Sequence, residues 1–272
     1  MLSIITVNKD NAQGLERTLR SVALQEPADF EQMVVDGAST DGSVDVIKKH
    51  EERIAWWVSE PDGGIYSAMN KGILRAKGDH CLFLNSDDCL IRPDILSRIQ
   101  DALRDDVDVL YSDAFVLEGG KRRLSRFPRN VSPGYFLVNT LNHQNAVIKR
   151  SLLLDLGLYR EDMRIASDWF FFLRAASERR AVYRHFPLPI ALYKNDGLSS
   201  TAEGSARNER ERALGIGELF PGMMPVVEEL AGFHESVYGS IIRHYGGSGI
   251  LVGILRAYRF AARCLSLFSK AR

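Results

Sequence analysis

The sequence has few cysteines and no excess of charge of either sign. Cys81, Cys89 and Cys264 show neither a metal-binding spacing nor an even disulfide framework, so we expect a reducing compartment. The 35 basic residues balance the 35 acidic ones over 272 positions. This balance leaves no global basic field that would attract nucleic acid, and no nucleic acid partner is expected.

Targeting and membrane-spanning segments are also missing. The first residues lack the basic segment of a secretory signal peptide and reach Lys9 and Asp10 too early for one. No apolar run approaches the roughly 20 residues that a spanning helix needs. These absences favour a cytoplasmic protein.

Two phosphate-binding signatures of α/β proteins do not occur. The chain contains neither the GxGxxG fingerprint of dinucleotide binding nor the Walker motif. The stretch GASTDG, at 37–42, resembles a phosphate loop in composition alone. An NAD-linked oxidoreductase is therefore disfavoured.

Short apolar runs alternate with amphipathic segments over the first part of the chain. Strands are predicted at 2–7, 32–37, 54–60, 81–85 and 107–113, and helices after Asn11 and at 39–50, 63–78 and 93–103. Asn11, and either Ser39 or Thr40, are expected helix N-caps. The alternation predicts an α/β fold with a mostly parallel sheet and helices on both faces.

The regular alternation stops near residue 119. The later part of the chain suggests a hairpin at 117–130, a loop, strand and helix within 142–157, a helix at 167–178, an extended segment at 185–195 and a helix at 200–215. We therefore divide the chain into a nucleotide-binding half at 1–118, a second half of the same domain at 119–204, and a helical C-terminal extension at 205–272.

Three predicted strands end in acidic residues. Asp36 closes one strand, Glu60 and Asp62 follow another, and Asp87 with Asp88 follows a third. The carboxyl ends of parallel strands share one edge of a sheet, so these side chains should gather there. Clustered carboxylates need a cation or a hydroxyl-rich ligand, and a nucleotide sugar arriving with Mg²⁺ or Mn²⁺ supplies both. Taken alone, the Asp36-Gly37 pair is more often a turn than a ligand site.

Five ordered motifs carry a resemblance to a known family. They are SIITVNKDN, VVDGASTDGS, SEPDGGIYSAMNKGI, LFLNSDD and ASDWFFFLR, and they span roughly residues 1 to 200. In this order they resemble family 2 glycosyltransferases with the Rossmann-like GT-A fold, closest to enzymes of bacterial polysaccharide assembly. The resemblance implies a nucleotide-sugar donor, with UDP as the commoner nucleotide. It also implies a glycan or lipid-linked glycan as the acceptor.

The resemblance implies donor-binding and metal-binding roles at matching positions. The base would lie beside Thr6, Val7 and Asn8, and the base or ribose would bind Asp36. The remaining donor positions are Asp62, Gly63, Lys71, Asn85, Ser86 and Asp87. Asp88 would coordinate Mn²⁺ or Mg²⁺. Asn85 stands where the family often has an acid, which leaves fewer carboxylates for the metal. The segment 194–200 resembles a loop that closes over the diphosphate, with Lys194 as a candidate phosphate partner.

Asp168 is the candidate catalytic base. A single displacement with inversion needs one carboxylate to take the proton from the acceptor hydroxyl. On the isolated stretch, Asp168 could equally be an acid that favours a helix N-terminus. The family often has Glu-Asp here, whereas this chain has Ser167-Asp168, so the resemblance implies Asp168. On the acceptor side it points to His143, Gln144 and Trp169, although the aromatic run that Trp169 begins is typical of core packing.

Two other functions stay open at this point. A sugar nucleotidyltransferase would show a glycine-rich basic loop after the first strand, where this chain has VNKDNAQG. A non-catalytic nucleotide- or glycan-binding protein would be expected to have lost some of its acids, but all of them are present.

The last part of the chain is basic and amphipathic. No acidic residue follows Glu235, whereas six basic residues do. Within 245–272, apolar residues recur at helical spacing opposite a basic face. A helix of this kind could pack on its own domain, form a homodimer interface, or lie on an anionic membrane. The last alternative would place the protein at the inner face of the cytoplasmic membrane.

Overall fold

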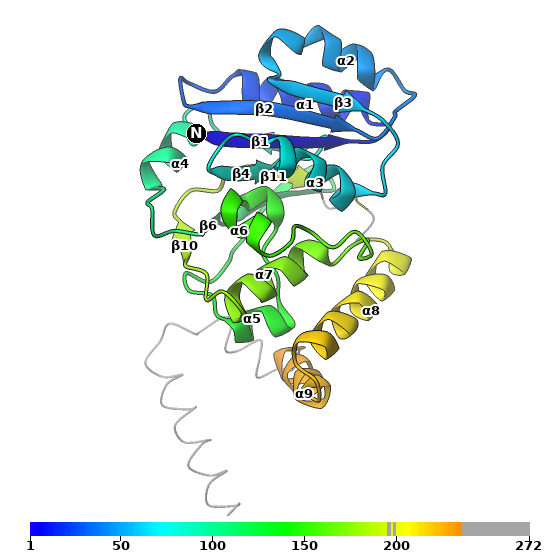
Figure 1. The fold of residues 1–272 in the computed structure, drawn as a ribbon, viewed down its shortest axis with the longest axis vertical. Helices are drawn as coiled ribbons and strands as arrows, with labels where there is room; N and C mark the ends of the chain where they lie inside the picture. The colour runs from blue at the N-terminus through cyan, green and yellow to red at the C-terminus, as the bar shows by residue number, and fades with distance from the viewer. Residues whose placement is uncertain (195–196, 198–199, 236–272) are drawn as a thin grey trace, which may run out of the picture. The chain divides into compact units, whose positions relative to one another are not determined.

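The computed structural model describes residues 1–194, 197 and 200–235 (Figure 1). The chain divides into two compact units, Met1–Leu219 and Phe220–Arg272. Helix α9 (Met224–Glu235) belongs to the second unit. None of the described helices is long and apolar enough to cross a membrane. The basic segment 245–272 lies outside the described residues.

The first unit is built on a seven-stranded sheet in the order β10-β6-β9-β4-β1-β2-β3. Its strands are β1 (Leu2–Asn8), β2 (Phe30–Asp36), β3 (Trp56–Ser59), β4 (His80–Phe83), β6 (Val109–Ser112), β9 (Ala146–Lys149) and β10 (Tyr183–Phe186). Only β9 runs antiparallel to its neighbours, β4 and β6. The predicted α/β fold with a mostly parallel sheet is confirmed.

Helices cover both faces of this sheet, as Figure 1 shows. The described helices of this unit are α1 (Ala12–Ala23), α2 (Ser43–Lys49), α3 (Ile65–Arg75), α4 (Ile95–Ala102), α5 (Pro133–Val138), α6 (Arg150–Asp155), α7 (Ser167–Ser177) and α8 (Ala202–Leu219), with short 3₁₀ turns at Glu51–Arg53 and His143–Asn145. Of these, α5 and α8 pack against α7. Every residue of the central strand β1 is buried, as expected for a strand with both faces covered.

The strand register brings the predicted acidic strand ends to one edge. Asn8 of β1 pairs with Asp36 of β2, and Asp36 pairs with Ser59 of β3. Beyond β4, the amide of Ser86 donates to the carbonyl of Val7 at 3.0 Å, which extends the ladder past the strand. The segment 85–88 therefore lies at the same edge as Asp36.

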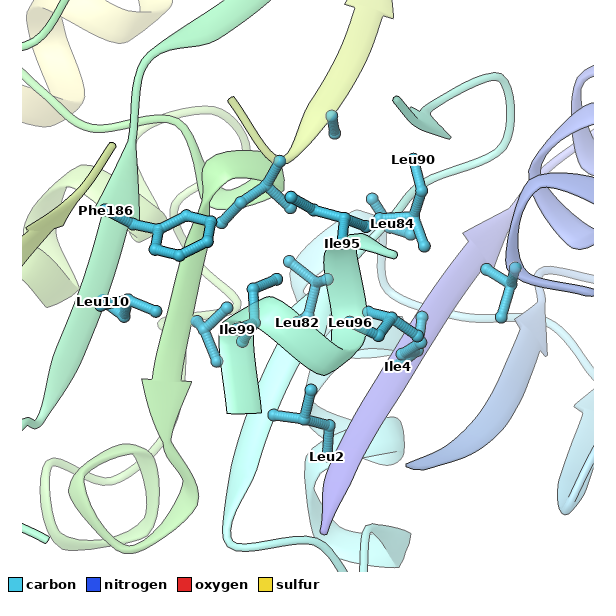
Figure 2. Close-up of a cluster of buried hydrophobic side chains, with 14 of the residues drawn as sticks. Leu2, Ile4, Leu82, Leu84, Leu90, Ile95, Leu96, Ile99, Leu110 and Phe186 are labelled. Carbon is cyan, nitrogen blue, oxygen red and sulfur yellow. The ribbon is translucent and has the colours of Figure 1, made fainter. Parts of the chain in front are cut away.

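A buried apolar cluster supports the strand that carries this segment. Leu82 and Leu84 pack with Ile95, Leu96 and Ile99 of α4, and side chains from β1, β6 and β10 complete the cluster (Figure 2). All five of these residues are fully buried. Because this packing fixes β4, the polar residues that follow Leu84 start from a rigid position.

A second, four-stranded sheet has the order β5-β11-β7-β8. It contains β5 (Cys89–Leu90), β7 (Ala114–Glu118), β8 (Lys121–Ser125) and β11 (Ala191–Lys194). The predicted hairpin is the pair β7–β8, which turns at Gly119 and Gly120 with positive φ angles of 55° and 79°. The predicted extended segment is split between the two sheets, into β10 and β11.

One of the two predicted N-caps is confirmed and the other is wrong. The side chain of Asn11 accepts from the amide of Gly14 at 3.0 Å and caps α1. Helix α2 instead begins after Gly42, and no side chain caps it. Ser39 does not cap α2: its hydroxyl donates to Asp36, and its oxygen accepts from the amide of Asp10 at 2.8 Å.

Candidate active site

Two cavities open at the carboxyl edge of the large sheet. The larger has a volume of about 430 Å³ and is lined by Gly64, Ile65, Tyr66, Asn85, Ser86, Asp87, Asp88, His143, Gln144, Arg164, Ile165, Asp168, Tyr193, Lys194 and Gly197. The smaller has a volume of about 180 Å³ and is lined by Thr140, Leu141, Asn142, His143, Gln144, Ile165, Ala166, Asp168, Trp169, Tyr193, Asn208 and Arg212. His143, Gln144 and Asp168 line both cavities, so these two spaces adjoin at the predicted base and at two predicted acceptor-side residues.

Two cations hold the carboxylate of Asp87 in the larger cavity. Nε of Arg17 lies 2.5 Å from Oδ1, and Nζ of Lys194 pairs with Oδ2. Burial opposes ionisation of Asp87, but the hydrogen bonds from both cations outweigh it and lower the pKa of the carboxyl below its usual value. The backbone of Asp87 has a φ of 86°, an uncommon angle for a residue other than glycine. The segment 85–88 thus has a specific shape, fixed by charge pairs from α1 and β11.

Asp88 is in a different environment from its neighbour. Its residue is 6% exposed, and Oδ2 accepts from the amide of Asn85 at 2.9 Å. Burial raises the pKa of Asp88 to about 7, because the nearby His143 offsets the desolvation only in part. Because burial disfavours the ionised form of Asp88, a cation bound beside this carboxylate would stabilise it.

A hydrogen-bonded series runs from the segment 85–88 to Asp168. Nδ2 of Asn85 lies 2.9 Å from Nε2 of His143, and Nδ1 of His143 lies 2.9 Å from Oδ2 of Asp168. In this arrangement Nε2 faces the side-chain amide of Asn85 and Nδ1 donates to the carboxylate of Asp168. The series links the predicted metal segment directly to the predicted base.

Three donors orient the carboxylate of Asp168, which lies in the first turn of α7. Besides His143, the amide of Trp169 donates to Oδ1 at 2.8 Å. The hydroxyl of Tyr66 is shared between Oδ1 at 3.0 Å and the carbonyl of Ile165 at 2.6 Å. A carboxylate has about four acceptor positions, so about one is left for a ligand. Asp168 is therefore held in place and can still accept from a hydroxyl in either cavity.

Asp36 differs from Asp168 because its carboxylate has no free acceptor position. It is fully buried, and its oxygens accept from Asn8, from Ser59, and from both the amide and the hydroxyl of Ser39, at 2.6 to 2.9 Å. Burial alone would raise the pKa of Asp36, but these bonds lower it. The structure thus places Asp36 as the group that joins the ends of β1, β2 and β3. Its contact with a base or ribose stays a prediction.

The predicted base-side residues lie outside the two cavities but at the same edge. Thr6, Val7 and Asn8 are buried at the end of β1. Oγ1 of Thr6 and Oδ1 of Asn8 are buried and have no hydrogen-bond partner among the described residues. Such orphaned acceptors are uncommon in proteins and are a reason to expect a donor from a ligand or water.

Three further predicted donor-binding residues already have hydrogen-bond or ion-pair partners within the protein. Asp62 accepts from the amide of Gly64 at 2.9 Å and shapes the turn at which α3 begins. The carbonyl oxygen of Gly63 accepts a hydrogen bond from Nη1 of Arg164 at 2.8 Å. Lys71 pairs with Glu60 at 2.8 Å. None of the predicted residues Asp62, Gly63 and Lys71 lines the two cavities described above.

The acceptor-side residues are brought together at the smaller cavity. Gln144 and His143 line both spaces, whereas Trp169 lines only the smaller one. Trp169 is 2% exposed and donates from Nε1 to the carbonyl of Phe136 at 2.6 Å. Its ring is therefore mainly part of the core, as the aromatic run suggested.

Sequence reasoning missed two residues of α8. The buried carboxylate of Glu211 accepts from the amides of Arg164, Ile165 and Ala166, at 2.8 to 2.9 Å, and so holds the loop that precedes Asp168. Arg212 lines the smaller cavity. Both lie in the charged run NERER, which is typical of a solvated helix face. The available signal was the spacing of Gly204, Asn208, Glu211 and Gly215 along one side of the helix.

Comparison with known proteins identifies the class of this chain. Residues 3–176 match the family described as Glycosyl transferase family 2. The chain belongs to this family and is a glycosyltransferase, which decides between the three functions that the sequence left open.

Relatives support the assignment. An uncharacterized glycosyltransferase of Mycobacterium tuberculosis is 37% identical over 180 residues, which cover 64% of this chain and 68% of the relative. A PGL/p-HBAD biosynthesis glycosyltransferase of Mycobacterium bovis is 32% identical over 214 residues, which cover 74% of this chain and 80% of that protein.

Solved structures show the same fold. S. aureus TarS in complex with UDP-GlcNAc superposes with a TM-score of 0.61 at 19% identity, over 79% of this chain and 66% of TarS, so this chain spans about two thirds of that protein. A mannosyltransferase from Pyrobaculum calidifontis in complex with GDP-Man and Mn²⁺ has a TM-score of 0.60 at 20% identity, over 97% of this chain and 80% of the other. The predicted GT-A fold is confirmed.

Proposed function

We propose that this glycosyltransferase transfers a sugar from a nucleoside-diphosphate sugar to an acceptor hydroxyl with inversion, and that Asp168 is the base. One observation carries the proposal: Asp168 lines both adjoining cavities and keeps one acceptor position free. A donor in the larger cavity and an acceptor in the smaller one would meet at this carboxylate. Proton removal by one positioned base is enough for a single displacement.

The larger cavity suits the donor because its charges are arranged for a diphosphate. Lys194 and Arg164 line it, and Arg164 forms no ion pair with any described residue. The two orphaned acceptors of Thr6 and Asn8, at the end of β1, suit a base with N–H donors. Nucleotide sugars are bound in the similar structures, as UDP-GlcNAc in S. aureus TarS and as GDP-Man in the mannosyltransferase. We favour UDP for this chain, in line with the first of these.

The donor set near Asp88 fits a divalent ion that arrives with its diphosphate. Among the described residues no group of three metal-ligating side chains occurs. The buried Oδ1 of Asn85 has no partner there, and the carboxyl of Asp88, which accepts from the backbone amide of Asn85, lines the same cavity. Mg²⁺ and Mn²⁺ are commonly held by one or two carboxylates together with substrate phosphates. Asp88, with the Asn85 oxygen, would hold the ion, which when bound neutralises the leaving diphosphate.

The chain's own residues prepare the transfer. His143 and the amide of Trp169 hold Asp168 in one orientation, and the loop before it is fixed by Glu211. When the acceptor hydroxyl attacks, Asp168 takes its proton, and the positive charges of Arg164 and Lys194 face the departing diphosphate. His143 passes no proton in this scheme, because its Nδ1–H serves to orient the base.

We place the acceptor among glycans or lipid-linked glycans of bacterial surface polysaccharides. A relative named as a putative teichuronic acid biosynthesis glycosyltransferase of Bacillus subtilis is 36% identical over 91 residues. Peripheral contact with an anionic membrane through 245–272, and a homodimer, remain proposals from the sequence, since that segment lies outside the described residues.

A screen of nucleotide sugars tests the donor half of the proposal. A donor that binds the folded protein should raise the melting temperature in the presence of Mn²⁺, and the effect should grow with donor concentration. Asp88→Asn should abolish the shift. Asp79→Asn, an exposed acid at the opposite end of β4, is the matched control and should not change the shift. If neither UDP- nor GDP-linked sugars raise the melting temperature of the unaltered protein, the donor assignment is wrong.

A further inference from the structure

Arg212 of α8 places a positive charge in the smaller cavity without a carboxylate partner. Arg160 and Arg174 each pair with an acidic side chain, whereas Arg212 forms no ion pair with any residue that the structure describes. Its Nη2 makes only two long contacts, at 3.4 and 3.5 Å, with the carbonyl oxygens of Asn139 and Leu137. Burial lowers the pKa of Arg212 to about 10, because the charge of Asp168, which forms no ion pair with Arg212, offsets the burial only in part; the group therefore remains charged at neutral pH.

The guanidinium is held in a fixed plane. Its central carbon lies 4.7 Å from the centre of the Trp169 ring, within the range of a cation–π contact. Trp169 cannot turn freely because its Nε1 donates to Phe136 in the core. Nε and Nη1 of Arg212 have no acceptor among the described residues, and the side chain lines the cavity. The free donors are therefore available to a ligand.

We propose that the smaller cavity binds an anionic group of the acceptor, a carboxylate or a phosphate, through Arg212. A partly buried cation without a partner is costly, and a ligand anion offsets that cost. The planar fork of donors on arginine matches carboxylate and phosphate oxygens, which can bind it in a bidentate manner. The acceptor is then an acidic sugar or a sugar phosphate.

The inference rests on the proposed function, because that function places the reacting hydroxyl beside Asp168. Both Asp168 and Arg212 line the same cavity of about 180 Å³, so the hydroxyl and the anionic group belong to one small unit of the acceptor. The amides of Asn142 and Asn208, also in the lining, suit the neutral hydroxyls of that unit.

Three matched probes test this inference in the full chain with UDP and Mn²⁺ present. D-glucose is neutral, D-glucuronate carries a carboxylate and D-glucose 6-phosphate carries a phosphate, all on the same ring. We expect one or both anions to bind at least about tenfold more tightly than glucose, as measured by ligand-observed NMR titration. The probe that gains more indicates which anion the acceptor carries. Equal binding of the three sugars, or no detectable binding of either anion up to about 50 mM, would overturn the inference.

Variants at one position assign the effect to Arg212. In Arg212→Gln the advantage of the anion should fall to less than about twofold, whereas Arg212→Lys, which keeps the charge but not the fork, should retain part of it. Arg210→Gln removes an exposed arginine of the same helix that lines neither cavity, and it should leave the advantage unchanged. An anion preference that persists in Arg212→Gln would contradict the inference.

The readouts separate this inference from the proposed function. UDP binding with Mn²⁺ reports on the larger cavity and should be the same in Arg212→Gln and in the unaltered chain. If Asp168→Asn abolishes transfer while Arg212→Gln keeps the anion preference, the proposed function stands and this inference fails. If Asp168→Asn transfers sugar normally, the proposed function fails, whatever the probes show.

Discussion

The exchange Asp168→Asn removes the proposed base with little change in shape. The amide oxygen of Asn can still accept from Trp169 and Tyr66, while its NH₂ group would face Nδ1 of His143. The imidazole can adapt by moving its proton to Nε2, because the buried Oδ1 of Asn85 has no partner and can rotate to accept it. The hydrogen bonds can therefore be remade, and we expect the melting temperature to change little.

The expected loss is in the rate of transfer. General-base catalysis contributes about 10²- to 10⁴-fold, or about 3–5 kcal/mol of the barrier. Donor affinity should fall much less than the rate, because the exchange leaves Asp87 and Asp88 untouched and changes at most the orientation of the Asn85 amide. The assay uses the donor found by the thermal screen, radiolabelled, with a bacterial cell-envelope extract as acceptor. Donor binding is measured separately by calorimetry.

Asp113→Asn is a matched control for this experiment. Asp113 is also a partly buried acid, with 19% of its side chain exposed against 16% for Asp168, and it also contacts a histidine, His185 at 3.3 Å. It lines neither cavity. Transfer should be normal in this variant. The reasoning is refuted if Asp168→Asn transfers sugar at the unaltered rate, or if it loses donor binding as completely as transfer.

The remaining predictions concern Asp88, Glu211 and the C-terminal segment 245–272. Because burial raises the pKa of Asp88 to about 7, calorimetry should show Mn²⁺-dependent nucleotide binding strengthening from pH 6 to pH 8, and none of this gain should appear in Asp88→Asn. Without metal, the folded state binds more protons than the unfolded state between about pH 4 and 7, so urea denaturation should show stability falling as pH rises, with a smaller fall in Asp88→Asn. Glu211→Gln, which leaves a loop amide with a poorer acceptor, should lower the free energy of unfolding by about 1–3 kcal/mol, whereas exposed Glu209→Gln should not. Deletion of 245–272 should reduce sedimentation with anionic vesicles; unchanged sedimentation would count against membrane contact.

The position of the catalytic edge could be predicted from the sequence because its signals are local. Alternating apolar and amphipathic segments indicated the strands, and polar residues at their ends indicated the edge. Asn85 to Asp88 follows β4, and Asp168 lies in the first turn of α7, as the motifs implied. These features depend on neighbouring residues in the chain, which a sequence displays directly.

What each acid does was decided by the tertiary structure. Asp36 and Asp168 looked alike as candidates, yet Asp36 has four donors and Asp168 has three, so only Asp168 keeps an acceptor position. Some of the donors to these two acids are neighbours in the sequence. Others come from segments that lie 23 to 102 residues away along the chain from the acid that they contact. A pattern of neighbouring residues in the sequence does not show hydrogen bonds between such distant segments.

The contribution of α8 shows the same limit. By itself, the sequence determined an α/β glycosyltransferase fold, the sheet edge at which we propose that ligands bind, and the acids available there. Only the folded chain brought Glu211 to the loop before Asp168, from which it is separated by 45 residues of sequence at Ala166. The same packing places Arg212 in the lining of the smaller cavity. The physical reason is that a charged helical run looks solvated until packing excludes water from one of its faces, and that packing depends on contacts between distant segments.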